Sequence, residues 1–160
     1  MLILLSLMLL ASCSNSELYR VVHPDAQYSK THLVRGDGLL SFPEYDLYLF
    51  PNPYGDKFSL QLEVRNHSAE RLAYSINSVS LKSSLKVKYT LLETQVYDCL
   101  SGDRIIPEDK TILIEGNRCI RIWYAFNTGT EKHRELTFQD WGLLRPVSVK
   151  FKRSKKSHLK

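Results

Sequence analysis

The sequence lacks the local motifs that mark most catalytic and metal sites. Its five histidines, at positions 23, 32, 67, 133 and 158, stand apart, and none has the His-x-His or His-Glu-x-x-His spacing that binds a metal. No serine lies in a Gly-x-Ser-x-Gly motif, and Gly102 and Gly116 stand singly rather than in a phosphate-binding loop. These absences predict a protein that is not an enzyme, with no catalytic residues, no metal and no cofactor.

No apolar run is long enough to cross a membrane. The longest, Leu2–Ala11, is broken only by Ser6 and spans about ten residues, whereas a transmembrane helix needs about 20. The polar run Ser14–Glu17 follows at once. This length is typical of the apolar core of a signal peptide. No Lys or Arg precedes the core, so only the α-amino group supplies the positive charge usual at the start of a leader.

The segment Leu10-Ala11-Ser12-Cys13, at the end of this core, resembles the lipobox of bacterial lipoproteins. In that family a diacylglyceryl group is attached to the cysteine thiol, and a peptidase then cuts before it. The resemblance implies a signal peptide over 1–12, lipidation (including palmitate) at Cys13 and a membrane partner reached through the lipid. Ser14 follows the cysteine, which in this family favours the periplasmic face of the outer membrane. The alternatives are an ordinary leader cut near Ser12 and a retained apolar N-terminus.

Excess positive charge is confined to the C-terminus. The net charge is +5, but five basic residues lie in the last ten positions, and the other 17 equal the 17 acidic residues in number. A basic tail over 153–160 is either a solvated end or a contact for anionic lipid headgroups. With a leader and no recognition motif, we expect no nucleic acid partner.

The apolar pattern is that of β-strands. Phe58, Leu60, Leu62 and Val64 alternate with polar residues, and no segment shows a sustained helical stripe. The next inward set, Leu72, Tyr74 and Ile76, slips in phase through Asn77-Ser78, which predicts a bulge. The other predicted strands lie at 46–50, 85–91, 96–99, 104–106, 111–114, 120–126, 135–138 and 147–151.

Short strands with turn signals roughly every 8 to 12 residues predict an all-β, antiparallel β-sandwich. The layout, with its Ile106-Pro107-Glu108-Asp109 corner, resembles the immunoglobulin-like domains of envelope lipoproteins, although the Cys, Trp, Cys order of antibody domains is absent. A small barrel is the alternative. The expected organisation is a signal peptide over 1–12, a tether over 13–40 with one short strand near 32–35, the sandwich over 41–152, and the tail.

Two cysteines remain after Cys13. Cys99 and Cys119 form an even pair in an oxidising compartment, where a bridge would stabilise the fold by roughly 3 kcal/mol. Strand phase places Cys119 on the face of Arg121 and Trp123. Cys99 shares that face only if a bulge falls near Leu92. A disulfide and two independent thiols therefore both remain open.

Aromatic residues supply the ligand-binding candidates. Tyr45, Tyr48, Phe50 and Tyr54 cluster around a turn, and Trp123 is predicted to point outward. Such rings are either core packing or a patch that stacks on a glycan or small ligand, for which Tyr48, Tyr54 and Trp123 are the candidates. We expect a non-catalytic, lipid-anchored envelope protein that binds a partner protein or supports an assembly; the alternative is a glycan- or small-ligand-binding module. An open apolar strand edge would favour the first function, whereas a concave, aromatic-lined pocket would favour the second.

Overall fold

The computed structural model of the chain describes residues 17–28, 36–107, 109–129, 133–143 and 145–155. The predicted leader and the predicted lipidation site, Cys13, lie outside the described residues, as does the short strand expected near 32–35. Within the ranges given, the secondary structure consists of strands and turns. A helix that could span a membrane is not found in this part of the chain.

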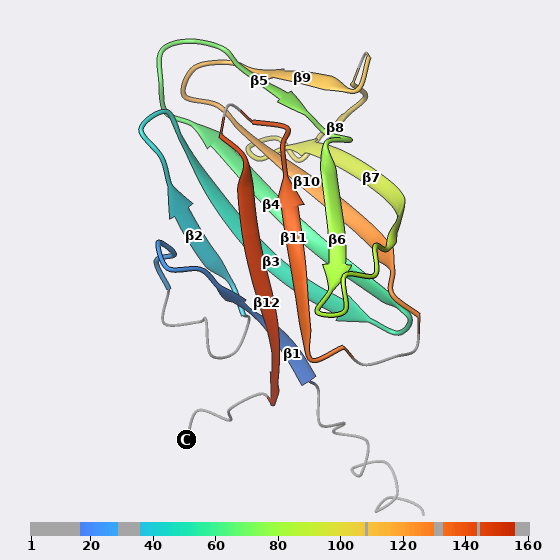
Figure 1. The fold of residues 1–160 in the computed structure, drawn as a ribbon. Coiled ribbons are helices and arrows are strands. Elements are labelled where there is room, and N and C mark those ends of the chain that lie inside the picture. The colour runs from blue at the N-terminus through green and yellow to red at the C-terminus, as the bar shows by residue number, and fades with distance from the viewer. Residues whose placement is uncertain (1–16, 29–35, 108, 130–132, 144, 156–160) are drawn as a thin grey trace, which may run out of the picture.

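Twelve strands are described, all paired antiparallel (Figure 1). They are β1 (Glu17–Val22), β2 (Gly38–Ser41), β3 (Tyr45–Tyr54), β4 (Lys57–Asn66), β5 (Leu72–Ser75), β6 (Val79–Ser83), β7 (Thr90–Asp98), β8 (Arg104–Ile105), β9 (Thr111–Ile114), β10 (Cys119–Asn127), β11 (Glu135–Asp140) and β12 (Val147–Lys155).

The strands form two facing sheets and a small lid. The larger sheet has the order β2-β3-β4-β10-β7-β8, and the smaller has the order β1-β12-β11-β6. Strands β5 and β9 pair with each other across one end of the sandwich, at the top of Figure 1. The fold is therefore an all-β, antiparallel, immunoglobulin-like sandwich, as the strand pattern predicted.

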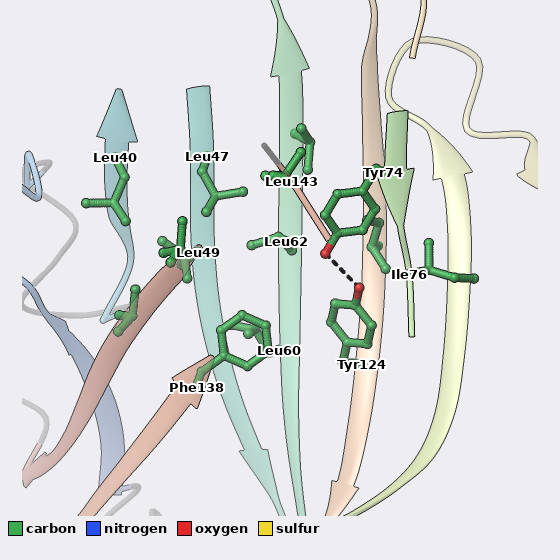
Figure 2. Close-up of a cluster of buried hydrophobic side chains, with 14 of the residues drawn as sticks. Leu40, Leu47, Leu49, Leu60, Leu62, Tyr74, Ile76, Tyr124, Phe138 and Leu143 are labelled. Atoms are coloured by element: carbon green, nitrogen blue, oxygen red, sulfur yellow. Dashed lines mark hydrogen bonds between the residues drawn. The ribbon is translucent and has the colours of Figure 1, made fainter. Parts of the chain in front are cut away.

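The core lies between the sheets and follows the predicted alternation. Phe58, Leu60, Leu62 and Val64 on β4 are buried, while the intervening side chains of this strand are more exposed. Buried and more exposed residues also alternate along β3 and β10, because successive side chains of a strand point to opposite faces. Figure 2 shows the inward residues of β3 and β4 packed beside Phe138 of the opposite sheet.

The predicted tether is wrong in its described part. Residues 17–22 form β1, which pairs along its whole length with β12, and the first three residues of β2 also lie in the interval assigned to the tether. Tyr19 and Val21 of β1 are buried in the core. Gly38 allows β2 to approach β1 closely, since a Cβ there would lie 2.7 Å from Val21 Cγ1. Strand β1 was not predicted because it is short and its partner strand, β12, is distant in the sequence.

The predicted domain end at 152 is also too early. Strand β12 continues to Lys155, which pairs with Glu17. The first three residues assigned to the basic tail therefore belong to a sheet.

Two other predictions in the middle of the chain are wrong. The phase slip at Asn77-Ser78 is a turn that carries the chain from β5 to β6, in different sheets, and not a bulge within one strand. The strand predicted over 85–91 begins only at Thr90. Leu85 is 84% exposed, and Lys86 adopts a φ of 64° in a turn closed by its N–H to the carbonyl of Ser83. The apolar residues at alternate positions of this turn gave the same pattern as a strand, which led to the wrong prediction.

Candidate binding surfaces

Cys99 and Cys119 form a disulfide, with their Cα atoms 5.4 Å apart. The register between β7 and β10 explains how they meet. Ala125 pairs with Glu93 but Phe126 pairs with Leu91, so Leu92 is an extra residue in β7. This bulge lies where the sequence required one for the two cysteines to share a face. The alternative of two independent thiols is therefore ruled out in this structure.

A tight turn that contains Cys99 leads from β7 to β8. The Asp98 carboxylate accepts hydrogen bonds from the N–H groups of Ser101 and Leu100, and it also accepts one from the guanidinium of Arg118 at 2.8 Å. These bonds, led by that from Ser101, lower the pKa of Asp98 to about 2. The carboxylate therefore stays charged and holds the turn under ordinary conditions.

The disulfide lies beside an acidic side chain. A carboxylate oxygen of Glu63 and the sulfur atoms of Cys99 and Cys119 all lie within 4.8 Å of one another. Metal binding by cysteine requires thiolates, and these two sulfurs are bonded to each other. In the disulfide form, this group does not provide a metal site.

The outer face of the six-stranded sheet carries an aromatic row. Strand register places Phe50 beside Gln61, Gln61 beside Trp123, and Trp123 beside Gln95. Two strand spacings separate Phe50 from Trp123, so these residues lie about 10 Å apart. A shallow hollow of about 140 Å³ lies at Trp123, lined in part by Ser59, Glu93 and Gln95.

Two arginines on this face contact a carboxylate or an aromatic ring. Arg121 Nε lies 2.8 Å from Glu63 Oε1, and Gln61 Nε2 donates to the same oxygen at 3.1 Å. The guanidinium of Arg65 lies over the ring of Tyr48, 5.5 Å from its centre. The face is therefore amphipathic and has no charge of one dominant sign.

The three predicted ligand-binding residues do not form one site. Tyr48 and Trp123 lie on the same outer face, and Tyr48 stacks on Phe50 with ring centres 6.5 Å apart. Tyr54 is 79% exposed at the β3–β4 turn, six residues or about 20 Å along the strand from Tyr48. Tyr45, in the same sequence cluster, is buried in the core. Gln61 and Gln95 were missed because cross-strand neighbours cannot be read from local sequence.

One margin of the larger sheet is open. Strand β7 pairs with β10 on one side, but on the other side β8 covers only Val96 and Tyr97. Within the described part of the chain, no strand pairs with Thr90–Gln95 on that side, which forms the right-hand margin of this sheet in Figure 1. Alternate residues of an antiparallel edge strand direct their N–H and C=O groups outward.

A groove of about 520 Å³ runs beside this open edge. The bulge turns Leu92 outward, and its side chain is 49% exposed. The groove is lined by both apolar and polar residues: Ile76, Asn77, Leu91, Leu92, Glu93, Thr94, Pro107 and Lys110.

A buried carboxylate lies at the end of the core under β5 and β9. Asp140 is only 1% exposed and accepts hydrogen bonds from Tyr74 Oη and the Gly142 N–H, both at 2.8 Å. Tyr74 also shares a hydrogen bond with Tyr124, drawn in Figure 2. Burial raises the pKa of Asp140 to about 6, against the opposing effect of the two hydrogen bonds. All three side chains are shielded from solvent, so this cluster joins the two sheets and the lid rather than facing a ligand.

Comparison with known proteins adds no family assignment: no protein-family model and no curated protein matches the chain.

Proposed function

We propose that this is a non-catalytic, lipid-anchored cell-envelope protein whose sandwich binds an extended segment of a partner protein along the open edge of β7. The observation that carries the proposal is the unpaired edge of Thr90–Gln95 beside a groove. A strand added to such an edge gains main-chain hydrogen bonds, and neighbouring pockets receive its alternate side chains.

The chemistry of the groove favours a peptide that carries both apolar and charged residues. Leu92 and Pro107 offer apolar surface, and Lys110 and Glu93 place charges of opposite sign along it. A short segment with an acidic residue opposite Lys110 and a basic residue opposite Glu93 fits this arrangement. The bulge at Leu92 restricts the length of a regular added ladder.

The anchor part of the proposal rests on the lipobox at Leu10–Cys13 and on the position of β1. Strand β1 begins at Glu17, four residues after Cys13. A chain of four residues spans at most about 14 Å, so a lipid at Cys13 holds the sandwich close to the bilayer. We place the protein on the periplasmic face of the outer membrane.

Site-specific photocrosslinking in cells tests the edge. A photoreactive amino acid at Leu92 is expected to yield one discrete protein adduct, whereas the same group at Tyr54, which is more exposed but lies on the β3–β4 turn, is not. Once the adduct is identified, Leu92→Lys should weaken its binding, because a charge on an edge strand opposes strand addition. Equal adducts from both positions, or none from Leu92, would contradict the proposal.

Lipidation is tested separately. Cys13→Ala should abolish incorporation of radiolabelled palmitate and leave an uncleaved or soluble chain. Incorporation at the wild-type level in the alanine variant would reject the anchor.

A second candidate function is glycan binding on the aromatic row. The observation that favours it is the alternation of rings and amides in Phe50, Gln61, Trp123 and Gln95, since rings stack on sugar faces while amides bond hydroxyl groups. The chain has two tryptophans, Trp123 and Trp141. In a Trp141→Phe variant, tryptophan fluorescence therefore comes from Trp123 alone and reports on this face. A saturable change with an extended polysaccharide, lost in Gln61→Ala, is the expected result; an unchanged spectrum would reject it.

A further inference from the structure

The outer face of the four-stranded sheet carries excess positive charge. Register places Arg20 beside Lys152 and Lys152 beside Glu135, while Lys150 lies beside Thr137, which is followed by Lys82. Among the described side chains of these strands on this face, Glu135 is the acidic one, and Lys150 and Lys152 both approach it, at 3.3 and 4.0 Å. Lys150 and Lys152 thus share one carboxylate.

A hollow of about 400 Å³ lies at the lower end of this face and is lined by Ser84, Arg134, Glu135, Lys152 and Arg153. These residues come from the end of β6, the start of β11 and the last part of β12. Figure 1 shows these three segments meeting at the end of the sandwich where β1 begins. The basic surface and the point where the chain enters the fold therefore lie at the same end.

We propose that this surface, the basic face formed by Arg20, Lys82, Lys150 and Lys152, lies against the membrane and binds anionic phospholipid headgroups. The orientation rests on the proposed lipid anchor: four residues from Cys13 to Glu17 keep the start of β1 within about 14 Å of the lipid. Attraction between exposed charges extends about 8 Å at physiological ionic strength, so only a surface at this end lies close enough to interact strongly.

Binding of the domain without its lipid tests the surface independently of the anchor. The chain from Ser14 to Lys160 lacks Cys13 but keeps all twelve described strands and the core. Its co-sedimentation is measured with vesicles of phosphatidylcholine alone and with vesicles that also contain phosphatidylglycerol, at low and at physiological salt. We expect binding only to the second kind, weakening as salt rises.

Three variants each remove two positive charges from different places. Lys150→Gln with Lys152→Gln alters the basic face; Arg71→Gln with Arg104→Gln alters the opposite end; and a stop after Lys155 removes Lys156 and Lys160 while keeping β12. All four substituted residues are exposed. At about 1 kcal/mol per basic residue near a charged surface, the first variant should bind about 30-fold more weakly. The other two should change affinity by less than about 3-fold.

Replacing Lys150 and Lys152 by arginine should preserve binding, since the charge remains. Equal losses in the face and opposite-end variants would overturn the proposal, because net charge alone would then explain them. A loss confined to the truncated chain would assign binding to the tail, and no binding by the wild type would also reject the basic face. The palmitate measurement decides the anchor separately, so failure of one proposal can be told from failure of the other.

Discussion

The two ends of the core are built from different chemistry. Near the β3–β4 turn, aromatic rings pack on one another. The ring centre of Phe58 lies 5.3 Å from that of Tyr19 and 5.2 Å from that of Phe151. Under β5 and β9, buried Asn66 and Asp140 are held by hydrogen bonds. Apolar packing is non-directional and depends on volume, whereas a buried polar group needs each partner in place. The first kind of core follows from a strand pattern, and the second requires particular atoms to meet.

The largest expected loss of stability comes from truncating a side chain in the apolar part of the core. Leu62→Ala should lower the free energy of unfolding by about 2–5 kcal/mol, because Leu62 is fully buried and its truncation leaves a cavity. Gln61→Ala, one residue away on the outer face, should change it by less than about 0.5 kcal/mol. Denaturant unfolding measures both. Similar losses at the two positions would reject the alternation of β4.

The pH dependence of stability distinguishes the polar end of the core from the apolar end, because the polar end contains the titratable Asp140. Its pKa is about 6 in the folded protein and 3.8 when unfolded, so the folded state binds the proton more tightly. The associated stabilisation is fully present below about pH 4 and is lost as pH rises through about 6, an effect of about 3 kcal/mol at most. Asp140→Asn should abolish this component of the stability–pH curve. An unchanged curve would show that Asp140 is not its source.

Loss of Asn66 should have a somewhat smaller effect. Its amide donates to the carbonyl oxygens of Glu70 and Ile114 at 2.7 and 2.9 Å, and its side-chain oxygen accepts from Ser68. Asn66→Ala leaves these groups without that partner and should cost about 1–3 kcal/mol in thermal or denaturant unfolding. Asn52→Ala, at an exposed position, is the matched control. Equal stability of the two variants would contradict the assigned network.

The smallest effect concerns one hydroxyl group. Tyr74→Phe keeps the ring but removes the donor to Asp140 and the partner of Tyr124, and should cost about 1–2 kcal/mol. Because the lost hydrogen bond favours the carboxylate, the pKa of Asp140 should rise further. Tyr54→Phe, on the surface, should leave both quantities unchanged. A lowered pKa in Tyr74→Phe would show that the hydroxyl acts otherwise.

Predictions from sequence succeeded where the local pattern of apolar and polar residues determines which side chains are buried. The alternation from Phe58 to Val64 predicted one buried face of β4, and the positions of Cys99 and Cys119 tied their disulfide to a bulge near Leu92. Predictions failed where a distant partner decides the structure. Strand β1 is stabilised by β12, while the apolar residues Leu85 and Val87, without such a partner, lie in an exposed turn.

The candidate surfaces show the same division. Trp123 was predicted to point outward from its own strand, but its neighbours Gln61 and Gln95 come from two other strands. The open edge of β7 follows from where β8 stops, and the basic face depends on how β1, β12, β11 and β6 are ordered. These are properties of topology, which local patterns do not encode.

The pairing of β1 with β12 also sets the order in which the molecule can assemble. Residues Glu17 and Lys155 are partners, so the four-stranded sheet cannot be completed until β12 has been synthesised. Neighbouring strands such as β3 and β4 close a short loop and are free to pair earlier, whereas contacts so distant in sequence form slowly. In a chain emerging N-terminus first, β1 therefore lacks its strand partner until β12 has emerged. We therefore expect the four-stranded sheet to form later in folding than the β3–β4 pair.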